Sequence, residues 1–213
     1  MLNLPANPDR AVPKRAALTC NYHQSCELLA YETYTVIVVK ENTPRQIYVL
    51  VYRREFHTED TRRFEIEAVP RGLNFAPGQQ PVHKFLYNKI EVLVELATNT
   101  AWLGPKGWII MSGDELKNCG VGSYLLGNAL SWLKSNYPES AIATGWLSPN
   151  DANEEDNRHR RDRFYRRQGL TIVYSDPESG DGHFWIDRAA DLTPGWNAEK
   201  VTELSPWSVI EKL

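Results

Sequence analysis

The sequence predicts a fold that contains both helices and strands (α/β in the broad sense). Within it we expect the α+β class, built on a mixed and mostly antiparallel sheet. Two observations carry this prediction. The N-terminal half holds four segments rich in β-branched and aromatic residues, which turn-forming clusters such as 41–44 and 76–78 separate. The second half holds two segments of helical character on either side of a further strand. We expect the four N-terminal strands to pair as an antiparallel meander, and they are 34–39, 46–52, 64–69 and 90–96.

The chain has 213 residues, of which 42% are hydrophobic and 24% charged, as in a globular protein with a real core. This length fits one domain with short appendages. We expect an N-terminal arm over 1–30 that is proline-rich and then helical from Tyr22 to Ala30. The main domain is expected over 31–190. A C-terminal tail over 191–213 is expected to pack on it through its tryptophans.

Charge, cysteines and hydropathy exclude several classes of protein. No stretch approaches 18 apolar residues and no basic start precedes an apolar run, so we expect a cytoplasmic protein without membrane association. Cys20, Cys26 and Cys119 form neither an even disulfide set nor a zinc knuckle, and we expect no metal. A formal net charge of −3 argues against nucleic acid as a partner. A homodimer is compatible with the sequence.

The segment 117–123, Lys-Asn-Cys-Gly-Val-Gly-Ser, is the most informative motif. Gly120 and Gly122 lack a Cβ, so they can take positive φ and let backbone N–H groups approach a pyrophosphate. Apolar residues then recur at helical spacing from Gly122 to about Tyr137, which places a helix N-terminus and its dipole beside the anion. Gly-x-Gly before a helix also describes an ordinary tight turn. The residues after Gly122 exclude both the dinucleotide fingerprint and the P-loop.

A second motif, Phe-Tyr-Arg-Arg-Gln-Gly-Leu over 164–170, lies on another predicted helix. Acidic residues 154–156 occupy its first turn and arginines its last, which suits the helix dipole, and Gly169 is placed to end it. Tyr165 is either a packed aromatic residue or a proton donor. A phenol with a reference pKa of about 10 can protonate a departing thiolate when it is held within hydrogen-bond reach.

In the order strand, loop, helix, strand, helix, the two motifs resemble the GNAT superfamily of N-acetyltransferases over residues 107–186. The resemblance implies a strand over 107–112, a second over 141–147, and an acetyl group transferred from acetyl-CoA to a primary amine. It implies that Tyr165 acts as general acid. The coenzyme-binding residues that it implies, through backbone groups along the strand and the pyrophosphate loop, are Ile110, Met111, Ser112, Lys117, Asn118, Cys119, Gly120, Val121, Gly122 and Ser123.

The chain departs from that family in two places. The Asn and Ala of the second signature fall on Arg158 and Arg161, and no helix is expected between 31 and 107, where the family places one or two to shape the acceptor pocket. The general base is therefore open. Candidates are the carboxylates and histidines Glu67, Glu91, Glu95, His159 and His183.

Six arginines lie within ten residues of the second helix, 158–167. They can form a solvated or ion-paired face, contact the coenzyme's phosphates, or bind RNA, and the first of these is favoured. Three functions thus compete. The first is an N-acyltransferase, the second an acyl-CoA-binding module without transfer, and the third an interaction domain that works through the arginine-rich helix.

Overall fold

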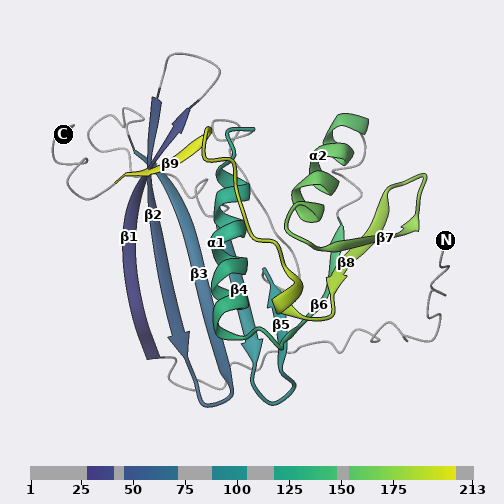
Figure 1. The fold of residues 1–213 in the computed structure, drawn as a ribbon, viewed down its shortest axis with the longest axis horizontal. Coiled ribbons are helices and arrows are strands. Elements are labelled where there is room, and N and C mark those ends of the chain that lie inside the picture. The colour runs from purple at the N-terminus through teal and green to yellow at the C-terminus, as the bar shows by residue number, and fades with distance from the viewer. Residues whose placement is uncertain (1–27, 41–45, 72–87, 105–117, 148–153, 205–213) are drawn as a thin grey trace, which may run out of the picture.

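The computed structural model describes residues 28–40, 46–71, 88–104, 118–147 and 154–204 (Figure 1). These residues form one nine-stranded sheet with two α-helices and a short 3-10 helix. The elements in chain order are β1 (Leu28–Lys40), β2 (Gln46–His57), β3 (Thr61–Arg71), β4 (Lys89–Glu95), β5 (Thr100–Leu103), α1 (Val121–Asn136), β6 (Ala141–Leu147), α2 (Glu155–Arg166), β7 (Thr171–Asp176), β8 (Asp181–Ile186), the 3-10 helix η5 (Ala189–Asp191) and β9 (Val201–Leu204).

The sheet is mixed and mostly antiparallel, with the order β7-β8-β6-β5-β4-β3-β2-β1-β9. The first four strands form an antiparallel meander, as predicted, and β5, which the sequence does not predict, extends it by one antiparallel strand. β5 and β6 pair in parallel, and only at their beginnings, where Thr100 lies opposite Ala141 and Ala101 opposite Ile142. Because a parallel pair needs a crossover, α1 connects these two strands. The α+β class is therefore confirmed.

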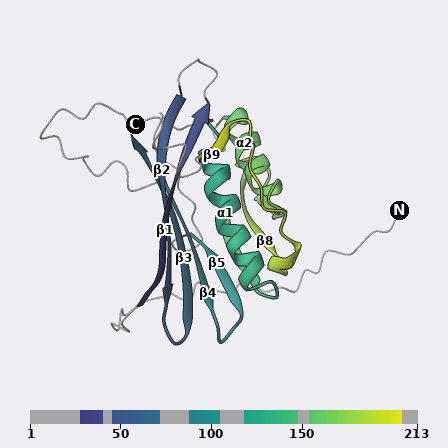
Figure 2. The same ribbon diagram turned by 60° about the vertical axis from the view of Figure 1, so that its left-hand side comes forward.

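Helix α1 packs on one face of the meander, as Figures 1 and 2 show. The strands beneath it alternate, so that Ile90, Val92 and Val94 of β4 point toward the helix and are buried completely. The ring of Trp132 on α1 stacks on Phe64 of β3 at 5.1 Å between centroids. The buried face of the helix consists of Val121, Tyr124, Leu125, Leu126, Gly127, Ala129, Leu130 and Leu133. This apolar contact is the main core of the protein.

The chain after β8 returns over α1 to the opposite edge of the sheet (Figure 1). On the way, Gly195 exchanges two hydrogen bonds with the buried side chain of Gln168, at 2.8 and 3.0 Å. A Cβ at Gly127 of α1 would lie 3.0 Å from the Gly195 carbonyl oxygen, which shows how closely the backbones approach. The segment then pairs with β1 as β9. The ring of Trp196 contacts Tyr124 edge-on at 5.0 Å, in the packing role predicted for the tryptophans of the tail.

Several predictions are corrected by the structure. Residues 28–30 belong to strand β1, so the helix predicted from Tyr22 to Ala30 is wrong at its end, and residues 22–27 lie outside the described part. The helix predicted from Gly122 and the strand over 141–147 are confirmed as α1 and β6. Strands β5, β7, β8 and β9 were not predicted, and the strand predicted over 107–112 lies outside the described residues. Neither described helix has the length and apolar character that a transmembrane helix needs.

Candidate functional site

The loop before α1 contains two residues in the left-handed region. Asn118 has a φ of 66° and Gly120, the N-cap of the helix, a φ of 85°. Gly120 thus takes the conformation predicted for it, whereas Gly122 lies in the first turn of α1 without a positive φ, so the second left-handed residue is Asn118. The first N–H groups of a helix have no intrahelical acceptor, and they carry the positive end of its dipole. The loop therefore presents donors at the N-terminus of α1.

Two cationic side chains meet at Asn118. The Lys200 ammonium donates to the Asn118 carbonyl oxygen at 3.2 Å, and the Arg160 guanidinium donates to the Asn118 side-chain oxygen at 3.3 Å. Both are exposed. Lys200 also packs beside the loop, because its Cβ would lie 3.3 Å from a Cβ built on Gly120. The sequence does not predict Lys200 at this site, and no local signal points to it, since the contact spans 82 residues.

The other predicted coenzyme-binding residues fall into two groups. The side chains of Cys119 and Val121 are buried, so only their backbones can serve a ligand, whereas Ser123 is half-buried. The remaining predicted residues, Ile110, Met111, Ser112 and Lys117, lie outside the described part of the chain. The described site consists of the loop 118–123 with Arg160 and Lys200 beside it.

Tyr165 lies in the last turn of α2 and is only 6% exposed. Its ring stacks on Phe184 of β8, with 4.5 Å between centroids and 19° between planes. Phe184 in turn covers Gly145 of β6, where a Cβ would lie 2.1 Å from the Phe184 ring, so a residue without a side chain is required there. This stack fixes the Tyr165 ring between α2, β8 and β6.

The arginines of α2 divide into partnered and unpartnered groups. Arg161 is buried and donates to the Asp162 carboxylate at 3.2 Å and to the Gly180 carbonyl at 3.1 Å. Arg158 lies over the Tyr174 ring at 4.6 Å, and the Tyr174 hydroxyl donates to Asp162. These contacts hold α2 on β7. The ion-paired interpretation of the arginine-rich helix thus holds for part of it.

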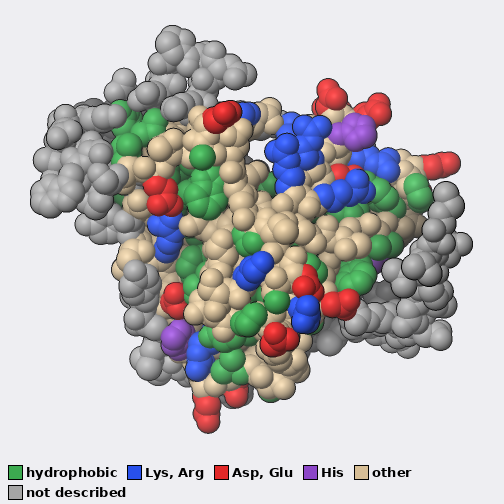
Figure 3. Space-filling view, viewed as in Figure 1, with side chains coloured by type: hydrophobic (Ala, Val, Ile, Leu, Met, Phe, Trp, Pro, Cys, Tyr) green, Lys and Arg blue, Asp and Glu red, His purple; other side chains and the backbone are tan. Residues whose placement is uncertain are grey.

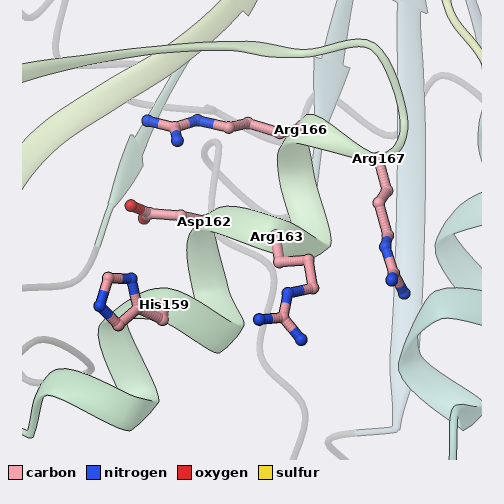
Figure 4. A pocket seen from close by; sticks show the side chains of 5 residues that line it. All are labelled: His159, Asp162, Arg163, Arg166 and Arg167. Carbon is pink, nitrogen blue, oxygen red and sulfur yellow. The ribbon is translucent and has the colours of Figure 1, made fainter.

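The remaining arginines, Arg163, Arg166 and Arg167, are exposed and have no hydrogen-bonding or ion-pairing partner for their guanidinium groups among the described residues. With His159 and Asp162 they line an open hollow of about 390 Å³ on α2 (Figure 4). Figure 3 shows the blue Lys and Arg atoms gathered over this helix. In Figure 4, Arg163 and Arg167 extend to one side of the helix, and Arg166 extends to the other.

The candidate general bases lie mainly on the other face of the sheet. Because Ile90, Val92 and Val94 point toward α1, Glu91 and Glu95 point away from it, and so does Glu67 of β3. Burial raises the pKa of the Glu91 carboxyl above its usual value, against the opposing effect of Lys89 and Arg63. If one of these carboxylates is the general base, the acceptor amine must approach the sheet from the face that α1 does not cover.

The two histidines lie elsewhere. The exposed His159 ring lies 3.3 Å from the Glu155 carboxylate, one turn earlier on α2. His183 is half-buried on β8, opposite Trp146 of β6. Within the described ranges, no group of three or more His, Cys, Asp or Glu side chains is arranged to hold a metal ion.

Comparisons with family models, with curated proteins and with solved structures give no match to this chain. The features that bear on function are therefore the loop before α1, the arginines of α2 and the Tyr165 stack.

Proposed function

We propose that this protein is an N-acyltransferase of the GNAT type, which transfers an acetyl group from acetyl-CoA to a primary amine. The observation that carries the proposal is the loop at the N-terminus of α1, where Asn118 and Gly120 are left-handed and Arg160 and Lys200 converge. Helix α1 connects the parallel strands β5 and β6, and ligands of α/β sheets bind at the carboxyl ends of such strands. A pyrophosphate is the anion that suits this loop.

Three kinds of group at the loop favour a phosphate. The N–H groups of the first turn of α1 point out of the helix, and the helix dipole adds about half a positive charge there. Arg160 contributes a planar guanidinium, which matches phosphate oxygens geometrically, and Lys200 contributes a compact charge. Cys119 contributes only backbone, since its side chain is buried. The coenzyme A pyrophosphate carries the charge that these groups would balance.

In the proposed reaction, the amine nitrogen attacks the thioester carbonyl carbon, and the carbon–sulfur bond breaks. The Tyr165 phenol gives its proton to the departing sulfur, so that coenzyme A leaves as a thiol, and the phenolate recovers a proton from solvent. The attacking amine loses one proton to a base or to water. Starting from an ammonium with a pKa of about 10.4, this deprotonation costs roughly 4.6 kcal/mol at pH 7. The stack on Phe184 supports the assignment of Tyr165, because it holds the ring in one orientation.

The phosphate loop is tested by Gly122→Val. A branched side chain in the first turn of α1 obstructs the approach of a pyrophosphate to the N–H groups, while the helix still forms. We expect acetyl-CoA to bind at least about tenfold more weakly, equivalent to about 1.4 kcal/mol. Titration calorimetry measures the dissociation constant, and circular dichroism verifies that the variant is folded. An unchanged dissociation constant in a folded variant would remove the loop from the coenzyme site.

The catalytic role is tested by Tyr165→Phe, which keeps the ring stacked on Phe184 and removes only the hydroxyl. We expect kcat to fall on the order of 10²-fold with nearly unchanged acetyl-CoA affinity, because the proton is needed only as charge develops on sulfur. Release of the free thiol, followed over a panel of amines, gives kcat. Equal kcat values for the two proteins would contradict the general-acid assignment.

A second function, binding of acyl-CoA without transfer, is favoured by two observations. Tyr165 is only 6% exposed, and β1 joins β2 through residues 41–45 alone, which leaves no room for the acceptor helices that the family resemblance implies. Native mass spectrometry of the purified protein with acetyl-CoA detects binding under either function. Thiol release with a saturating amine panel separates them, since a binding module shows the complex and no turnover.

A further inference from the structure

The guanidinium groups of Arg163, Arg166 and Arg167 differ from those of the other arginines whose side chains the structure describes. Every other arginine whose side chain is described contacts a carboxylate, a carbonyl, an amide or an aromatic ring, namely Arg53, Arg54, Arg62, Arg63, Arg158, Arg160, Arg161 and Arg188. These three groups, which have no partner among the described residues, all line one hollow, in a protein whose net charge is −3. Concentrated and unbalanced positive charge at a hollow is the arrangement that an anionic ligand neutralises.

Arg160, three residues before Arg163 on α2, contacts the loop before α1. Arg160 donates both to Asn118 of that loop and to Asn157 of its own helix, at 3.3 and 2.5 Å. Arg163 and Arg167 follow Arg160 at spacings of three and seven residues, so the three lie along one stripe of the helix. One turn separates Arg163 from Arg167, about 6 Å along the axis. Figure 4 shows these two side chains extended toward the same side of α2.

We propose that Arg163 and Arg167 bind the 3′-phosphate of the coenzyme's ribose, so that the protein discriminates coenzyme A from its 3′-dephospho form. The inference rests on the proposed function: Arg160 of α2 contacts Asn118 of the loop before α1, so a ribose joined to a pyrophosphate at that loop would lie close to α2. A phosphate monoester carries nearly two negative charges and three acceptor oxygens, which two neighbouring guanidinium groups can share. The one carboxylate of the hollow, Asp162, already accepts from Arg161 and Tyr174.

A discrete phosphate fits the surroundings better than a nucleic acid does. Glu154, Glu155 and Asp156 begin the same helix and are exposed, so a polyanion lying along α2 would meet negative charge within three turns. The arginines that remain unpartnered span only the second half of the helix. A single phosphate group can contact the arginines in the second half of α2 without approaching the acidic residues at its beginning.

The test compares coenzyme A with 3′-dephospho-coenzyme A by titration calorimetry on the full chain. The variants are Arg163→Gln/Arg167→Gln and, as a control, Arg188→Gln, which removes an exposed arginine that Asp191 pairs at 2.9 Å on η5. We expect the unaltered protein to bind coenzyme A at least about tenfold more tightly than the dephospho form. In the double variant the preference should fall below about threefold, with dephospho-coenzyme A affinity unchanged. The control should keep the full preference.

Each outcome decides a different point. If coenzyme A and its dephospho form bind the unaltered protein equally, the 3′-phosphate site is overturned while the proposed function stands. If neither form binds, the proposed function fails and the site fails with it. A third measurement, filter binding of a uridine 30-mer across a salt series, tests whether the arginines bind RNA. RNA binding that the double variant abolishes, with the coenzyme preference intact, would assign the stripe to a polyanion instead.

Discussion

Two clusters of charge, one on the sheet and one on α2, both contain arginines but differ in whether carboxylates are paired with them. On the face of the sheet without α1, three cations surround the buried carboxylate of Glu65. Lys89 lies 2.6 Å from it, Arg63 donates to it, and Arg54 lies 3.5 Å away. Glu67 and Glu91 complete this cluster, which therefore has three cations and three carboxylates. On α2, Arg163, Arg166 and Arg167 have no such partners among the described residues.

The difference separates charges that build the fold from charges that are available to a ligand. On the sheet, adjacent strands bring opposite charges together at fixed positions, since Glu65 of β3 lies opposite Glu91 of β4 and Arg54 of β2. Every charge there has a counter-charge. On α2, Arg158 and Arg161 are held by Tyr174 and Gly180, and Arg160 by Asn118 and Asn157, whereas Arg163, Arg166 and Arg167 line the hollow without a partner among the described residues. Mutation of the two clusters should therefore give opposite patterns of stability and binding.

The largest expected effect is on stability, from Glu65→Ala. The variant leaves Arg54, Arg63 and Lys89 without the buried carboxylate that they share, and removal of one member of a buried ionic cluster costs about 3–5 kcal/mol. The free energy of unfolding from urea titrations measures this cost. Glu199→Ala is the control, because Glu199 is an exposed carboxylate on the turn before β9. A loss below about 1 kcal/mol, no larger than a surface pair contributes, would show that the cluster does not stabilise the sheet.

The second prediction concerns the triple variant Arg163→Gln/Arg166→Gln/Arg167→Gln. Like charges three and four residues apart repel, whereas arginines in a last helical turn are favoured by the dipole, and the two effects nearly cancel. We therefore expect the free energy of unfolding to stay within about 0.5 kcal/mol of the unaltered protein. Urea titration at low and at high ionic strength measures it. A loss above about 2 kcal/mol would mean that these arginines stabilise the fold and are not reserved for a ligand.

The elements that the sequence predicts well are those with a clear period. Strand β4 is rich in β-branched residues, with Ile90, Val92 and Val94 at every second position, and α1 has apolar residues at helical spacing, so both follow from the pattern alone. Strand β2 runs to His57, five residues beyond its prediction, through the charged run Arg53-Arg54-Glu55. Charge usually signals the end of a strand, but here Arg54 pairs with Glu67 on β3 at 2.8 Å. Cross-strand pairing of this kind appears only once the register is known.

The candidate site was predictable in part for the same reason. Gly120 follows from local backbone chemistry, and its φ of 85° agrees with that prediction. Lys200 could not be found, because β9 brings it to Asn118 through strand pairing with β1, far away in the sequence. The sequence likewise places six arginines on one helix, but it cannot show which of them have partners. That depends on contacts with Asp162, Tyr174 and Gly180. Long-range packing decides both points.

The smallest expected effect comes from the balanced cluster itself, through the titration of Glu91. Burial raises the pKa of this carboxyl above its ordinary value of 4.5, so the folded protein favours the protonated form. Its favourable contribution is therefore present below pH 4.5 and is lost as the pH rises through the folded-state pKa. Glu91→Gln, which stays neutral, should be more stable than the unaltered protein at pH 7 by a few tenths of a kcal/mol. The difference should shrink toward about pH 4, as urea titrations at both pH values would measure. A variant less stable at neutral pH, with the loss disappearing in acid, would show instead that attraction to Lys89 and Arg63 outweighs burial at this carboxylate.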